Sequence, residues 1–215
     1  MHPLSVKELY IRAQSDLSKL LLLGGFPEPY FSGSERTAKR WSRTYRQRLI
    51  REDLEVNHAT AKKWLEIFSQ LYHVFTVPPF GSPKIKSVKK EFKHYHFDWS
   101  LIADRGNQFE NFIGSHLLKW CHWIEDTEGI DMELRYFRDK EQREVDFVIL
   151  QQNKPILFCE VKASERTFSP HLFYLKQKFP NVRAVQVTLD PIDPVLSPTG
   201  LELISALDFL QELPV

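Results

Sequence analysis

The second half of the chain shows a succession of hydrophobic patterns that restricts the fold more than any other feature of the sequence. Apolar residues at helical spacing run from about Gly106 to Trp123. Three strand-like stretches with β-branched or aromatic residues follow, separated by polar turns, at about 132–138, 143–150 and 155–163. A long helix followed by three short strands predicts a sheet with a helix packed on it.

The pattern then changes back to a helix and a strand. Pro170 is placed to open a helix, and Val182–Thr188 reads as a further strand. A helix between two strands forms a crossover, so we expect the last strand to lie parallel to the third. The tail, Leu203–Leu213, reads as a short closing helix. The predicted order of the second half is therefore α, β, β, β, α, β and a small helix.

The first half is predicted to be helical. Apolar positions indicate a helix over 5–23, which Gly24-Gly25 and the following prolines terminate. A second helix is expected from about Ser34 to Leu54, and a third over 57–75. We place a domain boundary between Phe97 and Gly106, which gives a basic helical domain over 1–97 and an α/β domain over 98–215.

The distribution of charge supports two different surfaces. The formal net charge is only +1, but residues 1–100 carry 17 Lys or Arg against 10 acids, while residues 101–215 carry 12 against 18. Such an asymmetry is typical of a chain with a binding surface for an anion in one half and a separate acidic surface in the other.

The basic surface is concentrated in the second helix and in the segment near residue 90. The helix has seven cations with no acid between positions 36 and 51, namely Arg36, Lys39, Arg40, Arg43, Arg46, Arg48 and Arg51. The lysine segment, 84–93, alternates loosely with apolar residues and includes Lys86, Lys89 and Lys90. A phosphate backbone or an acidic partner protein would balance these charges, and so would acids of the second half. We name Arg40, Arg43, Lys86, Lys89 and Lys90 as candidate DNA contacts.

The acidic half contains a pattern that points to metal chemistry. If the second and third strands form a hairpin centred on Asn153, Asp146 lies opposite Glu160 and Glu144 lies opposite Lys162. Directly opposed side chains have Cβ atoms about 5 Å apart, and two carboxylates at that separation repel unless a cation lies between them. A solvated hairpin face with ordinary charge pairs is the alternative. The strand from Ile156 to Val161 is apolar enough to be central, which favours the metal site.

Further side chains could complete this site. Glu110 lies at the edge of the apolar face of its helix and could reach the rim of the sheet as a ligand or supporting residue. Lys162 could orient a water or stabilise charge on a phosphate, with Mg²⁺ or Mn²⁺ as the ion. Arg143 and Glu144 flank the site as a supporting pair or as ordinary surface charge. The candidate catalytic residues are therefore Asp146, Glu160, Lys162 and Glu110, and the acids among them are the candidate metal ligands.

Composition and motifs exclude several classes of protein. The two cysteines, Cys121 and Cys159, lie in apolar surroundings without zinc-finger spacing, which argues against a disulfide scaffold and favours a reducing cytoplasm. The longest apolar run is far shorter than the roughly 20 residues of a membrane span, and we expect neither a leader nor a membrane partner. No GxxxxGK[ST] motif occurs, so no ATPase activity is expected of this chain.

These motifs resemble a known superfamily. The order α, β, β, β, α, β with Asp146, a spacing of 14, then Glu160-Val161-Lys162, resembles the PD-(D/E)XK nucleases. More closely, the chain is similar to a domain of unknown function found C-terminal to AAA-type ATPase cores in bacteria and archaea. Seven motifs carry that resemblance: Gly24-Gly25-Phe26-Pro27-Glu28-Pro29, Arg40-Trp41, Arg51-Glu52-Asp53-Leu54, Gln108-Phe109-Glu110-Asn111, Tyr136-Phe137-Arg138-Asp139-Lys140, Glu144-Val145-Asp146-Phe147 and Glu160-Val161-Lys162.

The resemblance implies a small helical, partly winged-helix-like domain followed by a restriction-endonuclease-like domain that hydrolyses phosphodiester bonds of DNA with Mg²⁺. The ATPase core usual in that family is missing here, and only the last helix of a winged-helix unit is recognisable after Leu54. The chain is thus interpreted as a truncated or internally deleted relative. The alternative is a catalytically inactive regulatory or adaptor module with the nuclease fold, which binds DNA, an AAA-type ATPase or an acidic protein partner.

Overall fold

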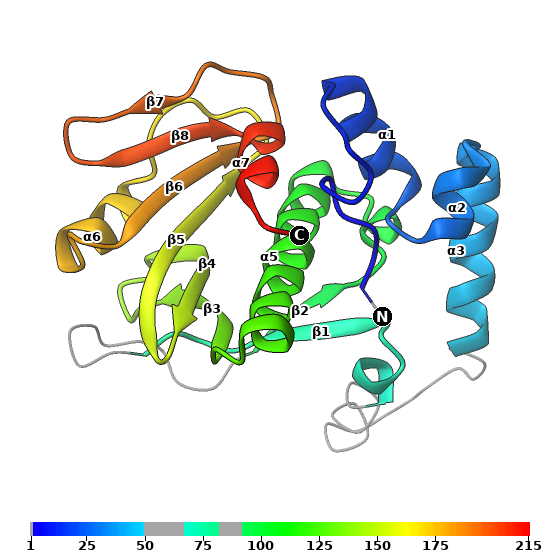
Figure 1. Cartoon of the computed structure of the whole chain (residues 1–215), viewed down its shortest axis with the longest axis horizontal. Helices are drawn as coiled ribbons and strands as arrows, with labels where there is room; N and C mark the ends of the chain where they lie inside the picture. Colours follow the sequence, from blue (N-terminus) through cyan, green and yellow to red (C-terminus); the bar gives the residue numbers. More distant parts are fainter. Residues whose placement is uncertain (1, 50–66, 82–91) are drawn as a thin grey trace.

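The computed structural model describes residues 2–49, 67–81 and 92–215 (Figure 1). In the described N-terminal part, helices precede a two-stranded antiparallel sheet and a 3-10 turn. These elements are α1 (Gln14–Leu23), α2 (Pro27–Ser32), α3 (Glu35–Leu49), β1 (Val74–Val77), β2 (Lys93–His96) and η1 (Trp99–Leu101).

The rest of the chain forms a six-stranded mixed sheet with three helices. Its elements are α5 (Arg105–Glu128), β3 (Met132–Arg138), β4 (Glu144–Gln151), β5 (Lys154–Lys162), α6 (Pro170–Lys178), β6 (Arg183–Thr188), β7 (Val195–Leu196), β8 (Leu201–Ser205) and α7 (Ala206–Glu212). The strand order is β3-β4-β5-β6-β8-β7. The β5–β6 and β6–β8 pairs are parallel and the other pairs are antiparallel, so the predicted parallel crossover through α6 is confirmed.

The β4–β5 hairpin has the predicted register near its middle. Phe147 faces Cys159 and Ile149 faces Leu157, and a bulge after Ile149 shifts the pairing toward the turn. The two turn residues, Gln152 and Asn153, have φ angles of 50° and 63°. Positive φ at both central residues matches the twist of a two-residue hairpin. The pairing ends at Phe147 and Cys159, one step before the predicted opposition of Asp146 and Glu160.

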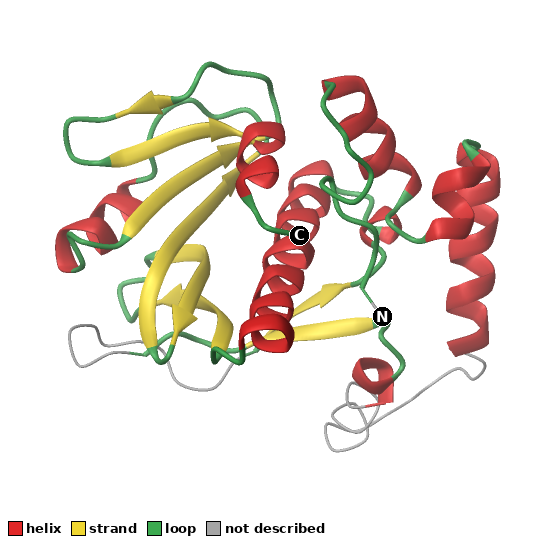
Figure 2. Ribbon diagram, in the orientation of Figure 1, coloured by secondary structure: helices red, strands yellow, loops and turns green. Residues whose placement is uncertain are grey.

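Helix α5 lies against one face of the sheet and has α1 and η1 on its other side (Figures 1 and 2). It begins where the Asp104 carboxylate accepts a hydrogen bond from the amide of Asn107, and it ends at Gly129 with a φ of 65°. Its buried face joins side chains of the sheet and of the N-terminal segment in one hydrophobic core, which includes Phe109, Phe112, Leu117, Phe147, Ile149, Cys159, Val161, Leu17, Leu20 and Trp99.

Helix α6 covers the opposite face of the sheet, where it closes a second hydrophobic core (Figure 2). Leu172 and Leu175 of α6 pack there with Val148 and Phe158 of the central strands. The alternation along β5 therefore places Cys159 on the α5 side and its neighbours on the α6 side, as a strand buried on both faces requires.

Two segments near the ends of the chain differ from the sequence prediction. The helix expected over 5–23 begins only at Gln14, because Tyr10 has a φ of 52°, a left-handed conformation that a helix cannot contain. The closing helix expected over Leu203–Leu213 is preceded by β8, since Leu201–Ser205 pairs in parallel with β6 before α7 begins at Ala206. Short apolar runs of this kind do not distinguish strand from helix.

The predicted α/β class is confirmed at the level of N-terminal helices and a mixed sheet with helices. Of the helix expected over 57–75, residues 67–70 are helical and Val74 already belongs to β1, so it ends earlier than predicted. Residues 50–66 lie outside the described ranges, and the boundary after residue 97 stays a prediction. In the described part of the chain, no helix combines the length and apolar character needed to cross a membrane.

The close approach of α5 to the sheet gives a test of this architecture. A Cβ atom at Gly114 would lie 2.7 Å from the ring of Phe147, so Gly114→Ala forces the helix or the ring to move. We expect this variant to lower the free energy of unfolding by about 1–3 kcal/mol despite the better helix propensity of alanine. Urea denaturation followed by circular dichroism measures it. Gly106→Ala, in the exposed first turn of α5, is the control, and equal stability of the two variants would contradict the predicted packing.

Candidate active site

A cluster of carboxylates surrounds one lysine where β2, β4 and α5 meet. The ammonium of Lys93 lies 2.6 Å from Oε1 of Glu144, 3.2 Å from Oε1 of Glu110 and 3.6 Å from Oδ1 of Asp146. The three acids come from two elements, because Glu144 and Asp146 are two residues apart on β4 and Glu110 belongs to the second turn of α5. We call these three side chains the carboxylate cluster.

The position of Glu110 follows from the packing of α5. Glu110 and Gly114 are four residues apart and therefore lie on the same face of the helix. Gly114 contacts Phe147, which directly follows Asp146 on β4. The absence of a side chain at Gly114 brings that face of the helix close to β4, and one turn earlier it brings Glu110 close to Asp146.

Strand β2 contributes two polar side chains to the cluster. Lys93 and Tyr95 are two residues apart, and the Tyr95 hydroxyl donates a hydrogen bond of 2.6 Å to Oε1 of Glu110. Burial and the charge of Glu110 raise the pKa of Tyr95 well above its ordinary value. Burial alone would lower the pKa of Lys93, but the carboxylates outweigh burial and raise it. Lys93 is therefore an ammonium and Tyr95 a neutral donor at neutral pH.

Asp146 takes the place of a backbone acceptor at the end of the β4–β5 ladder. Its Oδ2 accepts a hydrogen bond of 2.9 Å from the amide of Val161. The pKa of Asp146 is raised, first by burial and then by the charges of Glu110 and Glu160, while Lys93 and the Val161 amide act in the opposite direction. Such a carboxylate is more costly to ionise than one in water and binds a cation as compensation.

Glu160 and Lys162 form a second pair beside the cluster, on the adjacent strand β5. The Lys162 ammonium lies 3.0 Å from Oε1 of Glu160. Glu160 is 4% exposed, and its Oε2 atom is buried with no hydrogen-bond partner among the residues that the structure describes. Burial raises the pKa of Glu160, although Lys162 opposes the shift. A buried carboxylate oxygen normally has a donor or a cation next to it, so Oε2 is an acceptor to which a ligand could bind.

A cleft of about 230 Å³ reaches the cluster from solvent. Lys93 and Glu110 form part of its wall, and the other residues along it are His94, Tyr95, His96, Ile102, Asn107 and Asn111. The Asn111 amide group is held by the backbone of His96, with bonds to both its amide and its carbonyl. The cleft therefore runs between β2 and the first turns of α5, and it gives a ligand access to Lys93 and Glu110, whereas Glu144 and Asp146 do not line it.

The donors present suit a hard divalent cation in chemical type. Mg²⁺ and Mn²⁺ prefer carboxylate oxygen, and the cluster gathers three such groups beside the unpartnered oxygen of Glu160. Within the described ranges, however, no three His, Cys, Asp or Glu side chains form a group that could hold a metal as they stand. The ammonium of Lys93 lies between the carboxylates instead.

The structure places the four predicted catalytic residues in two adjacent groups. Glu110 and Asp146 meet at Lys93, whereas Glu160 and Lys162 pair with each other. Sequence reasoning did not assign Lys93 and Tyr95 to the site. It left the role of Glu144 open, although its spacing of two from Asp146 on one strand was a usable signal.

Arg143, the other flanking residue, belongs to a different network. Its guanidinium binds the carboxylate of Asp139 and lies 3.7 Å from the centre of the Tyr174 ring. It therefore stabilises the β3–β4 turn and does not pair with Glu144, which binds Lys93 and lies 3.5 Å from the Nε atom of Arg138.

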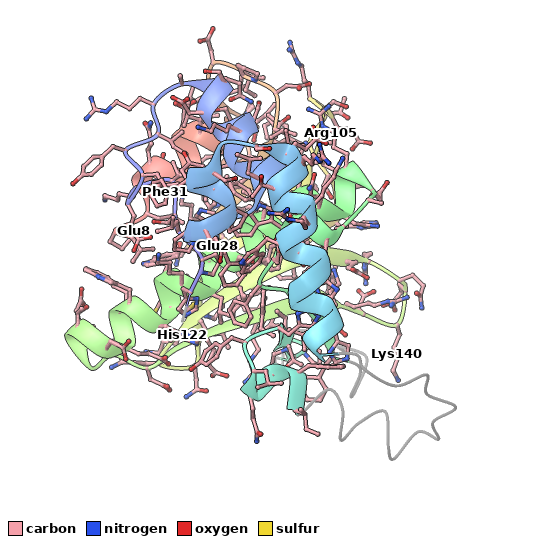
Figure 3. All side chains as sticks on the ribbon, turned by 90° about the vertical axis from the view of Figure 1, so that its right-hand side faces the viewer. Glu8, Glu28, Phe31, Arg105, His122 and Lys140 are labelled. Atoms are coloured by element: carbon pink, nitrogen blue, oxygen red, sulfur yellow. The ribbon has the colours of Figure 1, made fainter. Side chains whose placement is uncertain are left out.

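The candidate DNA contacts are only partly described. Arg40 is exposed on α3, which lies along the outside of the molecule (Figure 3). Arg43 is on the same helix, but its side chain is outside the described part. Lys86, Lys89 and Lys90 fall in residues 82–91, also outside it. Lys93, at the end of the same lysine segment, binds the protein's own carboxylates.

These features define a mixed α/β protein with a buried carboxylate cluster at the junction of a sheet and its covering helix. Residues 105–191 match a family described as a domain of unknown function, DUF4143, and residues 47–107 match a second one, DUF8612. The chain has no match among the curated proteins.

One solved structure is similar over part of the chain. It is a half-complex from a tetradecameric assembly of Thermococcus gammatolerans McrB AAA+ hexamers with bound McrC, at 16% identity and a TM-score of 0.31. The similarity covers 47% of this chain and 27% of the other, so this chain spans about a quarter of the matched chain's length. A likeness this distant carries no functional argument, and the function has to be argued from the cluster.

The raised pKa of Asp146 predicts how stability depends on pH. The native protein retains a proton that the unfolded chain releases above about pH 4, so stability is expected to fall as pH rises from there through the raised pKa. Asp146→Asn cannot ionise, and its urea midpoint in EDTA should decline less between pH 5 and pH 8. The exposed control Asp131→Asn should decline as the wild type does. Equal slopes for wild type and Asp146→Asn would show that Asp146 titrates normally.

Proposed function

We propose that this chain is a PD-(D/E)XK-type nuclease that hydrolyses phosphodiester bonds of DNA with Mg²⁺ or Mn²⁺. Its α/β part would be restriction-endonuclease-like and its N-terminal part a partial winged helix, derived from the C-terminal region of an AAA-type ATPase. One observation carries the proposal: Glu110 and Asp146, from different elements, both lie within 3.6 Å of a single cationic centre, beside the Glu160–Lys162 pair.

The proposed mechanism assigns a role in metal binding to the carboxylates. Asp146, Glu110 and Glu160 would hold the ion, and Glu144 is close enough to the first two to take part. Bound Mg²⁺ would supply charge neutralisation at the phosphate and lower the pKa of an attacking water. The hydrogen bonds from Tyr95 to Glu110 and from the Val161 amide to Asp146 fix the orientation of both carboxylates before any ligand arrives.

Lys162 would act on the substrate. Its side chain is 36% exposed, whereas that of its partner Glu160 is 5% exposed, so the ammonium lies at the solvent side of the pair. Burial tends to lower the pKa of Lys162, but Glu160 outweighs burial and raises it. Lys162 therefore carries a positive charge at neutral pH. In this role it stabilises negative charge that develops on the phosphate during hydrolysis.

A cleavage assay tests this mechanism. Linear, branched and single-stranded DNA are incubated with the full chain and Mg²⁺ or Mn²⁺. Asp146→Asn removes a charged ligand and Lys162→Met removes a cation aimed at the phosphate, and each is expected to reduce the rate by at least about 100-fold. The matched control is Lys119→Met, because Lys119 also pairs with a glutamate, Glu8, but on the N-terminal side of the molecule.

Three results would contradict the mechanism. Cleavage that survives both substitutions would mean that the activity arises elsewhere or from a contaminant. Cleavage that persists undiminished in excess EDTA would exclude the metal. Loss of cleavage in Lys119→Met would show that general destabilisation, and not the site, controls the rate.

A second function is favoured by the position of Lys93. Because an ammonium already lies among the carboxylates, the cluster has a counter-ion without a metal, as expected of a non-catalytic regulatory or adaptor module. This alternative predicts no heat of Mn²⁺ binding by calorimetry and no cleavage. Binding of DNA or of an ATPase partner by the N-terminal basic surface would then be the activity.

Binding of DNA by α3 is testable in both cases. Neutralising one phosphate contact, as in Arg40→Gln, should weaken DNA binding at low salt and reduce the slope of log K against log salt by about 0.9. Fluorescence anisotropy at several salt concentrations measures that slope. The control is Arg183→Gln, because Arg183 belongs to β6, on the far side of the molecule from α3 (Figure 1). An unchanged slope for Arg40→Gln would remove this residue from the interface.

A further inference from the structure

We propose that Lys93 is a tethered counter-ion which holds the carboxylate cluster together without metal and which a divalent cation must displace in order to bind. The proposal rests on the proposed metal site and assigns Lys93 as its positioning residue. Metal occupancy would thereby be coupled to the β1–β2 hairpin, which lies outside the sheet that carries Asp146 and Glu160.

The argument begins with the space around the ammonium. Its nitrogen lies 2.6–3.6 Å from one oxygen each of Glu144, Glu110 and Asp146. A divalent ion bound by the same oxygens would be at roughly 2.0–2.6 Å from each of them, in the volume that the ammonium fills. The two cations would also repel each other in a partly buried site. Lys93 and a metal are therefore alternatives at this centre.

The second step concerns charge. One ammonium balances only one of the three acids, so the cluster has an excess of two negative charges when Asp146 is ionised and of one when Asp146 retains its proton. Glu160 has its own cation in Lys162. Replacing a singly charged ion by a doubly charged one removes more of that excess. The orphaned Oε2 of Glu160 also gains a partner when a cation comes near it. Replacement of the ammonium by a divalent ion is thus electrostatically favourable, and it requires Lys93 to move away.

The third step identifies what moves and what stays. Tyr95, two residues along the same strand, is 6% exposed, donates to Glu110 and packs against Phe75 and Phe147. It anchors β2 to the cluster. Lys93 lies at the first position of that strand and has a long, flexible side chain, so it can leave the carboxylates while Tyr95 holds the backbone in place.

The experiment measures metal binding and stability in the full chain, not cleavage. Lys93→Met keeps the length of the side chain and removes its charge. In EDTA this variant should melt at a lower temperature than the wild type, because three carboxylates lose their cation. Mn²⁺ should restore more of the melting temperature than it adds to the wild type. By calorimetry the Kd for Mn²⁺ should fall by at least about tenfold, because a competing unit charge is gone.

Two further variants keep the test decisive. Lys119→Met should show wild-type binding of Mn²⁺, which excludes a general effect of losing one lysine. If Lys93→Met does not fold in EDTA, the double variant Lys93→Met with Glu144→Gln removes one charge of each sign, and it should fold and bind Mn²⁺ more tightly than Glu144→Gln alone. Equal or weaker binding in the variants that lack Lys93 overturns the proposal, as does a loss of stability that Mn²⁺ does not reverse.

The outcome is independent of the cleavage assay. Tighter Mn²⁺ binding without Lys93 supports the counter-ion role even if no DNA is cut. Metal-dependent cleavage by the wild type together with unchanged Mn²⁺ affinity in Lys93→Met supports the nuclease and rejects the counter-ion role.

Discussion

The packing of α5 on the sheet is the contact on which the remaining structure depends. Gly114 allows the helix to touch Phe147, and the same helix face carries Glu110 one turn earlier. The other side of α5 receives α1 and η1, with Trp99 fully buried beside Phe112. A change in the distance between this helix and the sheet would move Glu110 of the carboxylate cluster and the N-terminal helices together.

Charge compensation is the second constraint. It determines which charged side chains can be buried where α5 packs on the sheet. Asp146 and Glu160 are buried enough for their pKa values to be raised, so each needs a cation or hydrogen-bond donors nearby. Lys93 and Lys162 supply the cations, and the Val161 amide supplies a donor. Lysines therefore compensate these carboxylates where no metal is bound, with Lys93 held between them and one oxygen of Glu160 without a hydrogen-bond partner among the described residues.

Much of this frame could be predicted from local patterns. Strand alternation placed Glu160 and Lys162 on one side of β5 and Cys159 on the other. The predicted hairpin register was correct from Phe147 to Ile149, but the bulge after Ile149 makes it wrong by one residue next to the turn. These predictions depend on neighbours along the chain or directly across a hairpin. They succeed because periodicity and turn chemistry carry that information.

The features that escaped prediction depend on contacts between distant segments. Lys93 resembled the other lysines of its segment, and only the approach of β2 to α5 distinguishes it. Leu201–Ser205 became a strand because β6 presents a free edge to it, which its own sequence does not reveal. Tyr10 ended a helical pattern through its positive φ angle, which apolar spacing does not encode.

The near-neutral total charge has a structural meaning in this light. Lys93 belongs to the basic half of the chain, while Glu110, Glu144 and Asp146 belong to the acidic half. Lys119 and Glu8 form a reverse pair across the same predicted boundary. Part of the positive charge of the first half therefore forms ion pairs with acids of the second half. A fold that began at residue 98 would lose both Lys93 and Tyr95 from the cluster. The two halves are electrostatically complementary because they build one site together.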